Sequence, residues 1–428
     1  MPQPVRRRRS DDRIVELSGY LAISEITLSA TILVINSGSS SLKFSVYAAE
    51  ANSLTTLFTG AAEGIGKSEG QLTIEDGGGA QVFHEAARHG TQNDAFDHAS
   101  AELERLGHRR PAAIGHRIVH GGPHLREHTA ISAEVLRALT EAIHFAPLHL
   151  PTELEMIRVT QQRYPGVPQF ACFDTAFHRT MPAVVVTYAL PLRYREAGVQ
   201  RYGFHGLSYE SIVRALAPDI PARLVVAHLG SGASLCALQN GRSVDTSMGM
   251  TPTGGIPMGT RSGDLDPGVV LFIARSWNLS TGDLESMLNH ESGLAGLANG
   301  TSDMRTLTAA AANGDRDAAL AIDIFARSIG KTVASYAAVL NGLDMLVFTG
   351  GIGEHSPEVR ARACAPLAFL GIELDPEKNS RSGADTQGVI SARKALCPVR
   401  ILAADEDGQI ARHVLSMMNA SGVAARLK

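Results

Sequence analysis

Hydrophobic residues follow two closely similar patterns, one in each half of the chain. Residues 32–35 form an apolar run that ends in a Gly/Ser turn, and alternating apolar and polar residues follow at 42–47. The same order of apolar run, glycine turn and alternating segment recurs over 224–238. Such a run followed by alternation is typical of two strands joined by a tight turn. The sequence therefore predicts a β-hairpin near the start of each half.

Each half also contains a later apolar segment that ends in glycines, at 112–122 and at 344–355. Before the second of these, apolar residues spaced three and four apart predict a helix over 318–340. Strands that alternate with helices indicate an α/β fold. The repeated order of elements predicts a duplicated α/β unit with a cleft between its two copies.

Composition narrows the classes of protein that remain. Hydrophobic residues make up 44% and charged residues 19% of the 428 residues, which is typical of a globular protein of two or three domains. A net charge of −4 argues against a dedicated nucleic-acid binder, and no apolar run approaches the roughly 18 residues of a membrane span. The four cysteines form no CxxC pair, which predicts free thiols in a reducing, cytoplasmic compartment. We expect no nucleic-acid or membrane partner.

Residues 1–30 differ from the rest of the chain. A basic run at Arg6–Arg9 is followed by scattered acidic residues, and Glu16 and Glu25 interrupt the apolar stretch that a signal peptide would need. We expect a disordered extension. A regulatory tail, or one that binds an anionic surface, is the alternative.

Glycine clusters are the most unusual feature of the composition. Glycine accounts for 42 of 428 residues, above the ordinary level of about 7%. Backbone N–H groups in a Gly/Ser turn can cradle phosphate oxygens, and Lys43 adds a positive charge beyond the first turn. An ordinary β-turn explains any single cluster. Two equivalent turns, with Gly350–Glu354 at a third strand end, favour a nucleotide site.

Isolated charged residues stand in apolar or glycine-rich surroundings. Arg117 lies inside a strand-like run, Asp174 follows a buried strand, and Arg261 lies on a loop of small residues. An arginine in such a setting needs an anionic partner, either a structural carboxylate or a bound ligand. Two such arginines favour a phosphate or carboxylate ligand. His149 and His205 are further candidates, although a buried structural histidine is the alternative for each.

Seven motifs together resemble those of the acetate kinase (acetokinase) family. They are Asn36–Lys43, Gly115–Gly122, Phe173–His178, Arg201–Gly206, His228–Gly232, Met258–Pro267 and Thr349–Glu354. The resemblance implies two duplicated ribonuclease-H-like domains, the actin-like ATPase fold, with the active site in the cleft between them. It places the first domain at 31–173, completed by a C-terminal helix at about 408–428, and a nucleotide-binding domain at 174–407.

The resemblance also implies roles for individual residues. Its catalytic positions match Asp174, His205, Arg261 and His149. Its acyl-substrate positions match Arg117, Val119, Leu148, Phe204 and Pro252. Its nucleotide positions match Lys43, His228, Leu229, Gly230, Ser231, Gly232, Asp303, Met304, Arg305, Gly351, Ile352, Gly353, Glu354 and His355. Its metal positions match Asn36 and Glu406, which would hold Mg²⁺, with Mn²⁺ as an alternative.

The implied activity is reversible, Mg²⁺-dependent transfer of the γ-phosphate of ATP to acetate, by a homodimer. Two departures from the family pattern bear on this expectation. Leu150–Thr152 replaces Asn-Pro-Pro, and Asp405–Asp407 replaces Asn-Glu-Glu beside the metal position. A kinase for propionate or another short acyl acid is one alternative. An actin- or chaperone-like ATPase is another, although few residues remain for a peptide-binding domain.

Overall fold

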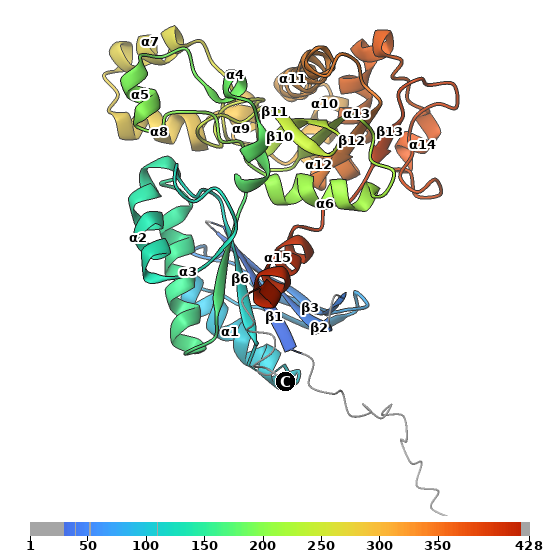
Figure 1. Ribbon diagram of the computed structural model, residues 1–428. Coiled ribbons are helices and arrows are strands. Elements are labelled where there is room, and N and C mark those ends of the chain that lie inside the picture. The colour runs from blue at the N-terminus through green and yellow to red at the C-terminus, as the bar shows by residue number, and fades with distance from the viewer. Residues whose placement is uncertain (1–29, 39, 51–52, 109, 421–428) are drawn as a thin grey trace, which may run out of the picture.

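The computed structural model describes residues 30–38, 40–50, 53–108 and 110–420. Two β-sheets, each with helices against it, form the two halves of the molecule (Figure 1). The expectation for the N-terminal extension lies outside the described residues, except that Ala30 is the first residue of a strand. No helix in the described part of the chain is long and apolar enough to cross a membrane.

The first sheet has eight strands in the order β5-β4-β3-β2-β1-β6-β8-β7. They are β1 (Ala30–Ser37), β2 (Ser41–Glu50), β3 (Ser53–Glu63), β4 (Gln71–Asp76), β5 (Gln81–Ala86), β6 (Ala113–Ile118), β7 (Thr129–Ala130) and β8 (Gln169–Phe173). Its helices are α1 (Gln92–Arg105), α2 (Ala133–Glu141), η1 (Ala142–Phe145), α3 (Leu150–Arg163) and, from the end of the chain, α15 (Glu406–Ala420).

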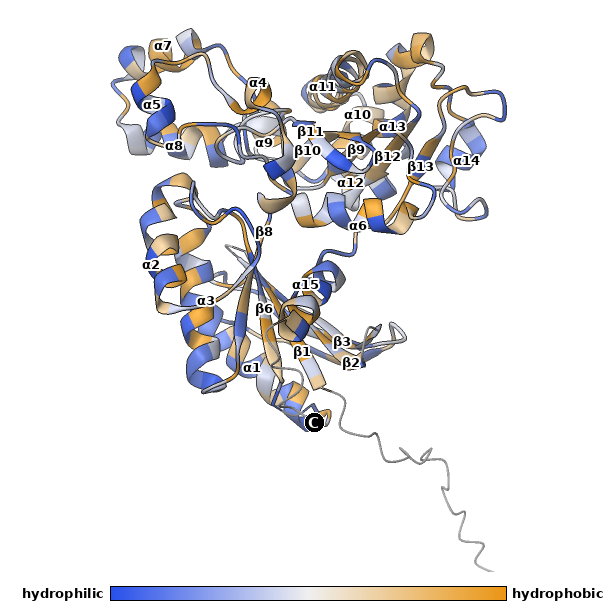
Figure 2. Cartoon of the chain, in the orientation of Figure 1, coloured by the Kyte–Doolittle hydropathy of each residue, from blue (hydrophilic) through white to orange (hydrophobic). Residues whose placement is uncertain are grey.

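Strand β1 is buried on both faces because helices cover both sides of the sheet. Leu33 and Ile35 pack in one cluster with residues of α1 and α3. Ile32 and Val34 point the other way and pack against α15. The close approach of α15 requires glycine at 115, because a Cβ there would lie 2.7 Å from methyl carbons of α15. Figure 2 shows orange, hydrophobic residues along β1 and β6.

The second sheet has five strands in the order β11-β10-β9-β12-β13. They are β9 (Arg223–Leu229), β10 (Ala233–Gln239), β11 (Arg242–Thr246), β12 (Met345–Thr349) and β13 (Val399–Ile401). The remaining helices are η2 (Ala176–Thr180), α4 (Ala183–Val186), α5 (Leu192–Glu196), α6 (Gly206–Leu216), α7 (Pro267–Trp277), α8 (Thr281–His290), α9 (Gly293–Leu297), α10 (Met304–Ala312), α11 (Arg316–Val339), α12 (Gly350–His355), α13 (Pro357–Cys364), η3 (Ala365–Leu370) and α14 (Pro376–Ser380). Alternate residues of β9 pack against α6 on one face and α11 on the other.

The two sheets share one strand order. β3-β2-β1-β6-β8 in the first corresponds to β11-β10-β9-β12-β13 in the second. In each, the first strand along the chain pairs antiparallel with the second and parallel with the fourth of these five. The predicted α/β fold, both hairpins and the helix over 318–340 are confirmed. The domain boundary between 173 and 174 stays a prediction.

Candidate active site

A cavity of about 660 Å³ lies between the two halves of the molecule. It is lined from both predicted hairpin turns, from the start of α12 and from the residues that lead into α15. The lining residues are Asn36, Gly38, Ser41, Lys43, Ser45, Tyr47, Thr59, Arg117, His205, His228, Gly230, Ser231, Gly232, Gly350, Gly351, Glu354 and Ala404–Asp407. The duplicated fold thus brings equivalent glycine turns to face each other, because each follows the first strand of its sheet.

Arg117, on β6, is the best-anchored cation of the cavity. Its Nε and Nη2 donate to the two carboxylate oxygens of Asp174 at 3.2 and 2.6 Å, and its Nη1 donates to Asn36 Oδ1 at 3.1 Å. Glu406 Oε2 lies 3.8 Å from Arg117 Nε. Burial lowers the pKa of Arg117, but Asp174 and Glu406 outweigh that effect and raise it above its ordinary value. The guanidinium is therefore permanently charged and fixed in orientation.

Arg261 has a different environment. Its Nη1 donates to the Pro252 carbonyl at 3.2 Å, and among the described residues no carboxylate lies within ion-pair distance of it. Burial and the charge on Arg117 lower the pKa of Arg261. A Cβ added to Gly232 would lie 3.5 Å from Arg261 Nη1 and 3.4 Å from His205 Nε2. Both side chains therefore approach the glycine turn, and Arg261 lacks the anion that its charge requires.

His205 precedes α6 in the left-handed conformation, with φ 57°, which is uncommon for a residue with a side chain. Its Nδ1 lies 2.9 Å from Ser234 Oγ, and its ring stacks on that of His228 at 4.3 Å. Burial, His228 and the two arginines lower the pKa of His205 well below its ordinary value. A neutral imidazole that accepts the serine hydroxyl at Nδ1 carries its proton on Nε2, where it can donate to an anionic oxygen.

Oxygen ligands for a divalent cation line the same cavity. Asn36 Oδ1 and Glu406 both lie beside Arg117, whereas the neighbouring aspartates are engaged elsewhere. Asp405 caps α15 through Gly408 N, and Asp407 accepts a hydrogen bond from Ser45 at 2.6 Å. An amide and a carboxylate oxygen suit Mg²⁺, which keeps several waters. The residues present therefore fit the predicted metal.

A second group could in principle hold a metal: His128, Glu210 and His413, the one such group among the described residues. His128 Nδ1 accepts the N–H of Phe173 at 3.0 Å, which places the imidazole proton on Nε2. His413 Nε2 lies 2.7 Å from Glu210 Oε2. With its proton on Nε2, His128 has no lone pair to offer a metal, and His413 and Glu210 already pair with each other, so we assign the group to the connection between α6 and α15.

The predicted nucleotide residues divide into two sets. Lys43, His228, Gly230–Gly232, Gly351 and Glu354 line the cavity. Leu229, Met304 and Gly353 are buried, which leaves only their backbone for contact with a ligand. Ile352 is half-buried and His355 exposed. Asp303 caps α10 by accepting Thr306 N, and Arg305 is exposed beside it.

The predicted acyl-substrate residues also divide. Val119 and Phe204 are buried in one apolar cluster. Leu148, His149 and Pro252 line a separate cavity of about 460 Å³, whose wall α8 completes. Burial, then the charges on the two arginines, lowers the pKa of His149 to about 4, which places this histidine near them as a neutral group. The apolar cavity therefore adjoins the charged cleft, since Arg261 Nη1 donates to the carbonyl of Pro252.

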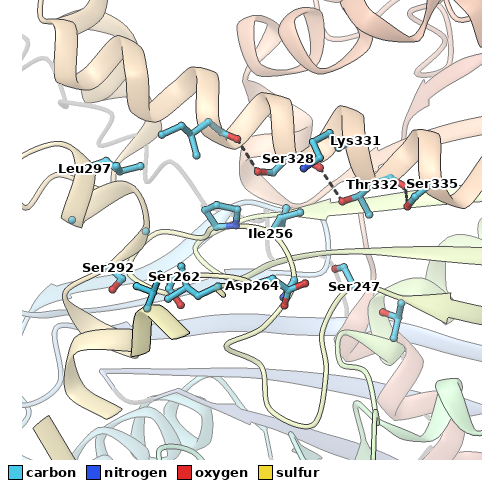
Figure 3. Close-up of a pocket in the computed structure, with 18 of the residues that line it drawn as sticks. Ser247, Ile256, Ser262, Asp264, Ser292, Leu297, Ser328, Lys331, Thr332 and Ser335 are labelled. Carbon is cyan, nitrogen blue, oxygen red and sulfur yellow. Dashed lines mark hydrogen bonds between the residues drawn. The ribbon is translucent and has the colours of Figure 1, made fainter. Parts of the chain in front are cut away.

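A cavity of about 800 Å³, larger than the one in the cleft, lies elsewhere (Figure 3). Ser328, Lys331, Thr332 and Ser335 of α11 project into it, opposite the loop that contains Ile256 and Asp264. None of the predicted site residues lines it. Size alone would favour this cavity, whereas the convergence of charged side chains favours the cleft as the candidate site.

Comparison with known proteins identifies the family. The model of the acetokinase family matches residues 31–412. An acetate kinase of Methylocella silvestris is 42% identical over 409 residues, which cover 92% of this chain and 99% of the relative. A propionate kinase of Escherichia coli O157:H7 is 43% identical over 388 residues, covering 89% and 94%.

Solved structures agree with the sequence comparison. A propionate kinase from Francisella tularensis superposes with a TM-score of 0.82 at 38% identity, covering 90% of this chain and 98% of that one. An acetate kinase of Porphyromonas gingivalis superposes with a TM-score of 0.79 at 35% identity, covering 91% and 100%. On both comparisons, the chain belongs to the acetokinase family and is a phosphotransferase whose acceptor is a carboxyl group.

Proposed function

We propose that this chain is an acetate kinase, which transfers the γ-phosphate of ATP to acetate and gives acetyl phosphate and ADP, reversibly. The observation that carries the proposal is the pair of arginines in one cleft. Arg117 is held rigidly by Asp174, and Arg261 faces the glycine turn with no carboxylate partner in the described part of the chain. One cation is thus available for the substrate carboxylate and one for the phosphoryl group.

The chemistry needs charge compensation more than proton transfer. A carboxylic acid is already ionised at pH 7, so no general base has to create the nucleophile. Two unit charges 4 Å apart repel by about 4 kcal/mol at an effective dielectric constant of 20. In this mechanism Arg117 orients the acceptor, and Arg261 and His205 bind the oxygens of the phosphoryl group during direct in-line transfer.

Asp174 serves as a positioning group in this mechanism. Both of its carboxylate oxygens accept hydrogen bonds from Arg117, so the carboxylate holds that guanidinium in one orientation. Lys43 and the backbone of the two glycine turns would contact the ATP phosphates. Asn36 and Glu406 would hold Mg²⁺, which neutralises phosphate charge when it is bound.

Propionate is the second candidate acceptor. The apolar cavity beside Leu148 and Pro252 offers about 460 Å³, more room than a methyl group needs. One methylene changes binding by only about 1–3 kcal/mol, so both acids can be substrates of one pocket.

Acyl phosphate formation tests the proposal directly. Purified protein is incubated with ATP, Mg²⁺ and acetate, propionate or butyrate, and the product is trapped as the hydroxamate. We expect rapid formation with acetate or propionate and loss of the product when EDTA removes the metal. ATP hydrolysis without hydroxamate from any of the three acids would contradict the proposal and favour an ATPase.

We also propose that the chain forms a homodimer through α7. This helix buries none of its side chains, and Leu271, Phe272 and Trp277 are 60%, 59% and 65% exposed. Val269 and Ile273 of the same helix line the cavity of about 800 Å³, so the apolar surface continues into a hollow. Apolar surface of this extent is typical of an interface between subunits.

Substitution on α7 tests the dimer. Leu271→Asp with Phe272→Asp places two charges on the apolar face and is expected to convert a dimer into monomers, as measured by light scattering on a sizing column. Phe369→Asp, at another exposed aromatic residue, is the control and should leave the mass unchanged. A monomeric parent protein, or a doubly substituted protein that remains dimeric, would rule out this interface.

A further inference from the structure

A buried glutamate beneath the cleft has no role in the mechanism above. Glu153 lies on α3 with only 2% of its surface exposed. It projects from the face of the helix that buries Leu150, Leu154 and Ile157, all at most 2% exposed. Glutamate is almost never fully buried unless it is paired. A carboxyl group on this apolar face therefore needs a hydrogen-bond partner.

The carboxyl group of Glu153 meets the backbone of the cleft wall. Both of its oxygens accept the N–H of Val119, each at 3.2 Å. No cation lies within ion-pair distance of it among the described residues. The charged groups that act on it from the packed elements are Arg117 on β6 and Asp174 after β8, while His116 of β6 contacts Thr160, farther along α3.

Val119 connects the substrate arginine to the apolar wall. It is the first residue after β6, two positions beyond Arg117. Its side chain packs in the same cluster as Phe204, together with residues of the second sheet. An acceptor that fixes the Val119 N–H therefore fixes how the end of β6 packs on Phe204, and the resemblance to the family assigns both residues to the acyl substrate.

We propose that Glu153 is a positioning residue for the acyl substrate, which holds the Val119 N–H and so sets the apolar wall relative to Arg117. This inference rests on the proposed function. It predicts an effect on the Michaelis constant for the carboxylic acid, with little effect on that for ATP, whose predicted contacts lie on the glycine turns.

Two substitutions separate the hydrogen bond from the charge. Glu153→Leu removes the acceptor and leaves the Val119 N–H unpaired, and we expect the KM for acetate or propionate to rise about 10-fold or more. Glu153→Gln keeps an acceptor oxygen and should restore KM to within about 3-fold of the parent. Glu155→Leu, at an exposed position of the same helix, is the control and should change neither constant.

The pH dependence of the KM for the acid distinguishes this role from a purely structural one. Burial raises the pKa of Glu153 to about 8, while Val119 N–H and Arg117 oppose the rise. Above that pH the carboxylate becomes charged and weakens the attraction of Arg117 for the substrate anion. In the parent protein KM for the acid should therefore rise between pH 7 and 9, and in Glu153→Gln it should stay level.

The outcomes are distinguishable from a failure of the proposed function. If the parent protein phosphorylates none of the acids, the proposed function fails and this inference fails with it. If the parent is active and Glu153→Leu has an unchanged KM for the acid, only the inference on Glu153 is wrong. Should Glu153→Leu fail to fold, the pH profile of Glu153→Gln decides, and a rise equal to that of the parent would overturn the inference.

Discussion

Replacing Arg261 with alanine is expected to lower kcat by about 10³-fold or more, and the variant should unfold at the same temperature as the parent or a higher one. The large kinetic effect follows from its position, because Arg261 and His205 approach the glycine turn where a phosphoryl group would lie. The absence of a stability cost follows from its contacts. Its guanidinium donates to one carbonyl and, among the described residues, pairs with no carboxylate, so the folded protein carries the cost of burying it. Steady-state kinetics and calorimetry measure the two quantities.

Arg360 is the matched contrast. It is fully buried, but its guanidinium donates to Asn379 Oδ1 and to the carbonyls of Gly353 and Glu354. Arg360→Ala leaves these acceptors unpaired and should lower the unfolding temperature. If Arg261→Ala instead lost stability and kept its kcat, Arg261 would be a structural residue and the mechanism would be wrong.

Replacing Arg117 with leucine is expected to reduce kcat/KM for the carboxylic acid by about 10³-fold and also to destabilise the fold. Here the two effects have separate causes. The substrate loses its cation, and Asp174, only 1% exposed, becomes a buried carboxylate without its partner. Removing one member of a buried ion pair costs about 3–5 kcal/mol. Urea unfolding and the hydroxamate assay measure the two losses.

The double variant Arg117→Leu with Asp174→Asn separates these causes. Neutralising Asp174 should recover most of the stability and none of the activity. Asp174→Asn alone keeps one acceptor for Arg117 and should slow turnover by disturbing its orientation. A turnover rate unchanged in Asp174→Asn would contradict the positioning role. Recovery of activity in the double variant would show that Arg117 does not bind the substrate.

Local patterns explain why much of the fold could be predicted. The short-range periodicity of apolar residues predicts strand β1 and helix α11, and local clusters of glycine and serine predict the two turns. Arg117, Asp174 and Arg261 could be picked out because each is a charged residue in apolar or glycine-rich surroundings, whereas Asn36 and Glu406 followed only from the resemblance to the family. In the hairpin, Asn36 pairs directly with Lys43.

Features set by distant packing could not be predicted in this way. Glu153 lies at a helical spacing typical of a buried position, but only the packing of α3 on β6 shows that its carboxyl group meets Val119. The left-handed backbone of His205 depends on its place between Asp174 and α6, where Gly206 N donates to the Asp174 carbonyl. The exposure of α7 is likewise invisible in its apolar sequence, since such a helix is ordinarily buried within its own chain.

The contribution of α15 to the first sheet has a consequence for how the protein is made. Ile32 and Val34 are among the first described residues to be synthesised, yet the helix that covers them contains Ile410 and Val414. Domains usually fold in order as they leave the ribosome. Here one face of the first sheet stays uncovered until Glu406–Ala420 have been synthesised. Nascent chains arrested before α15 should therefore be bound by chaperones that recognise apolar surface, and chains that include α15 should be released.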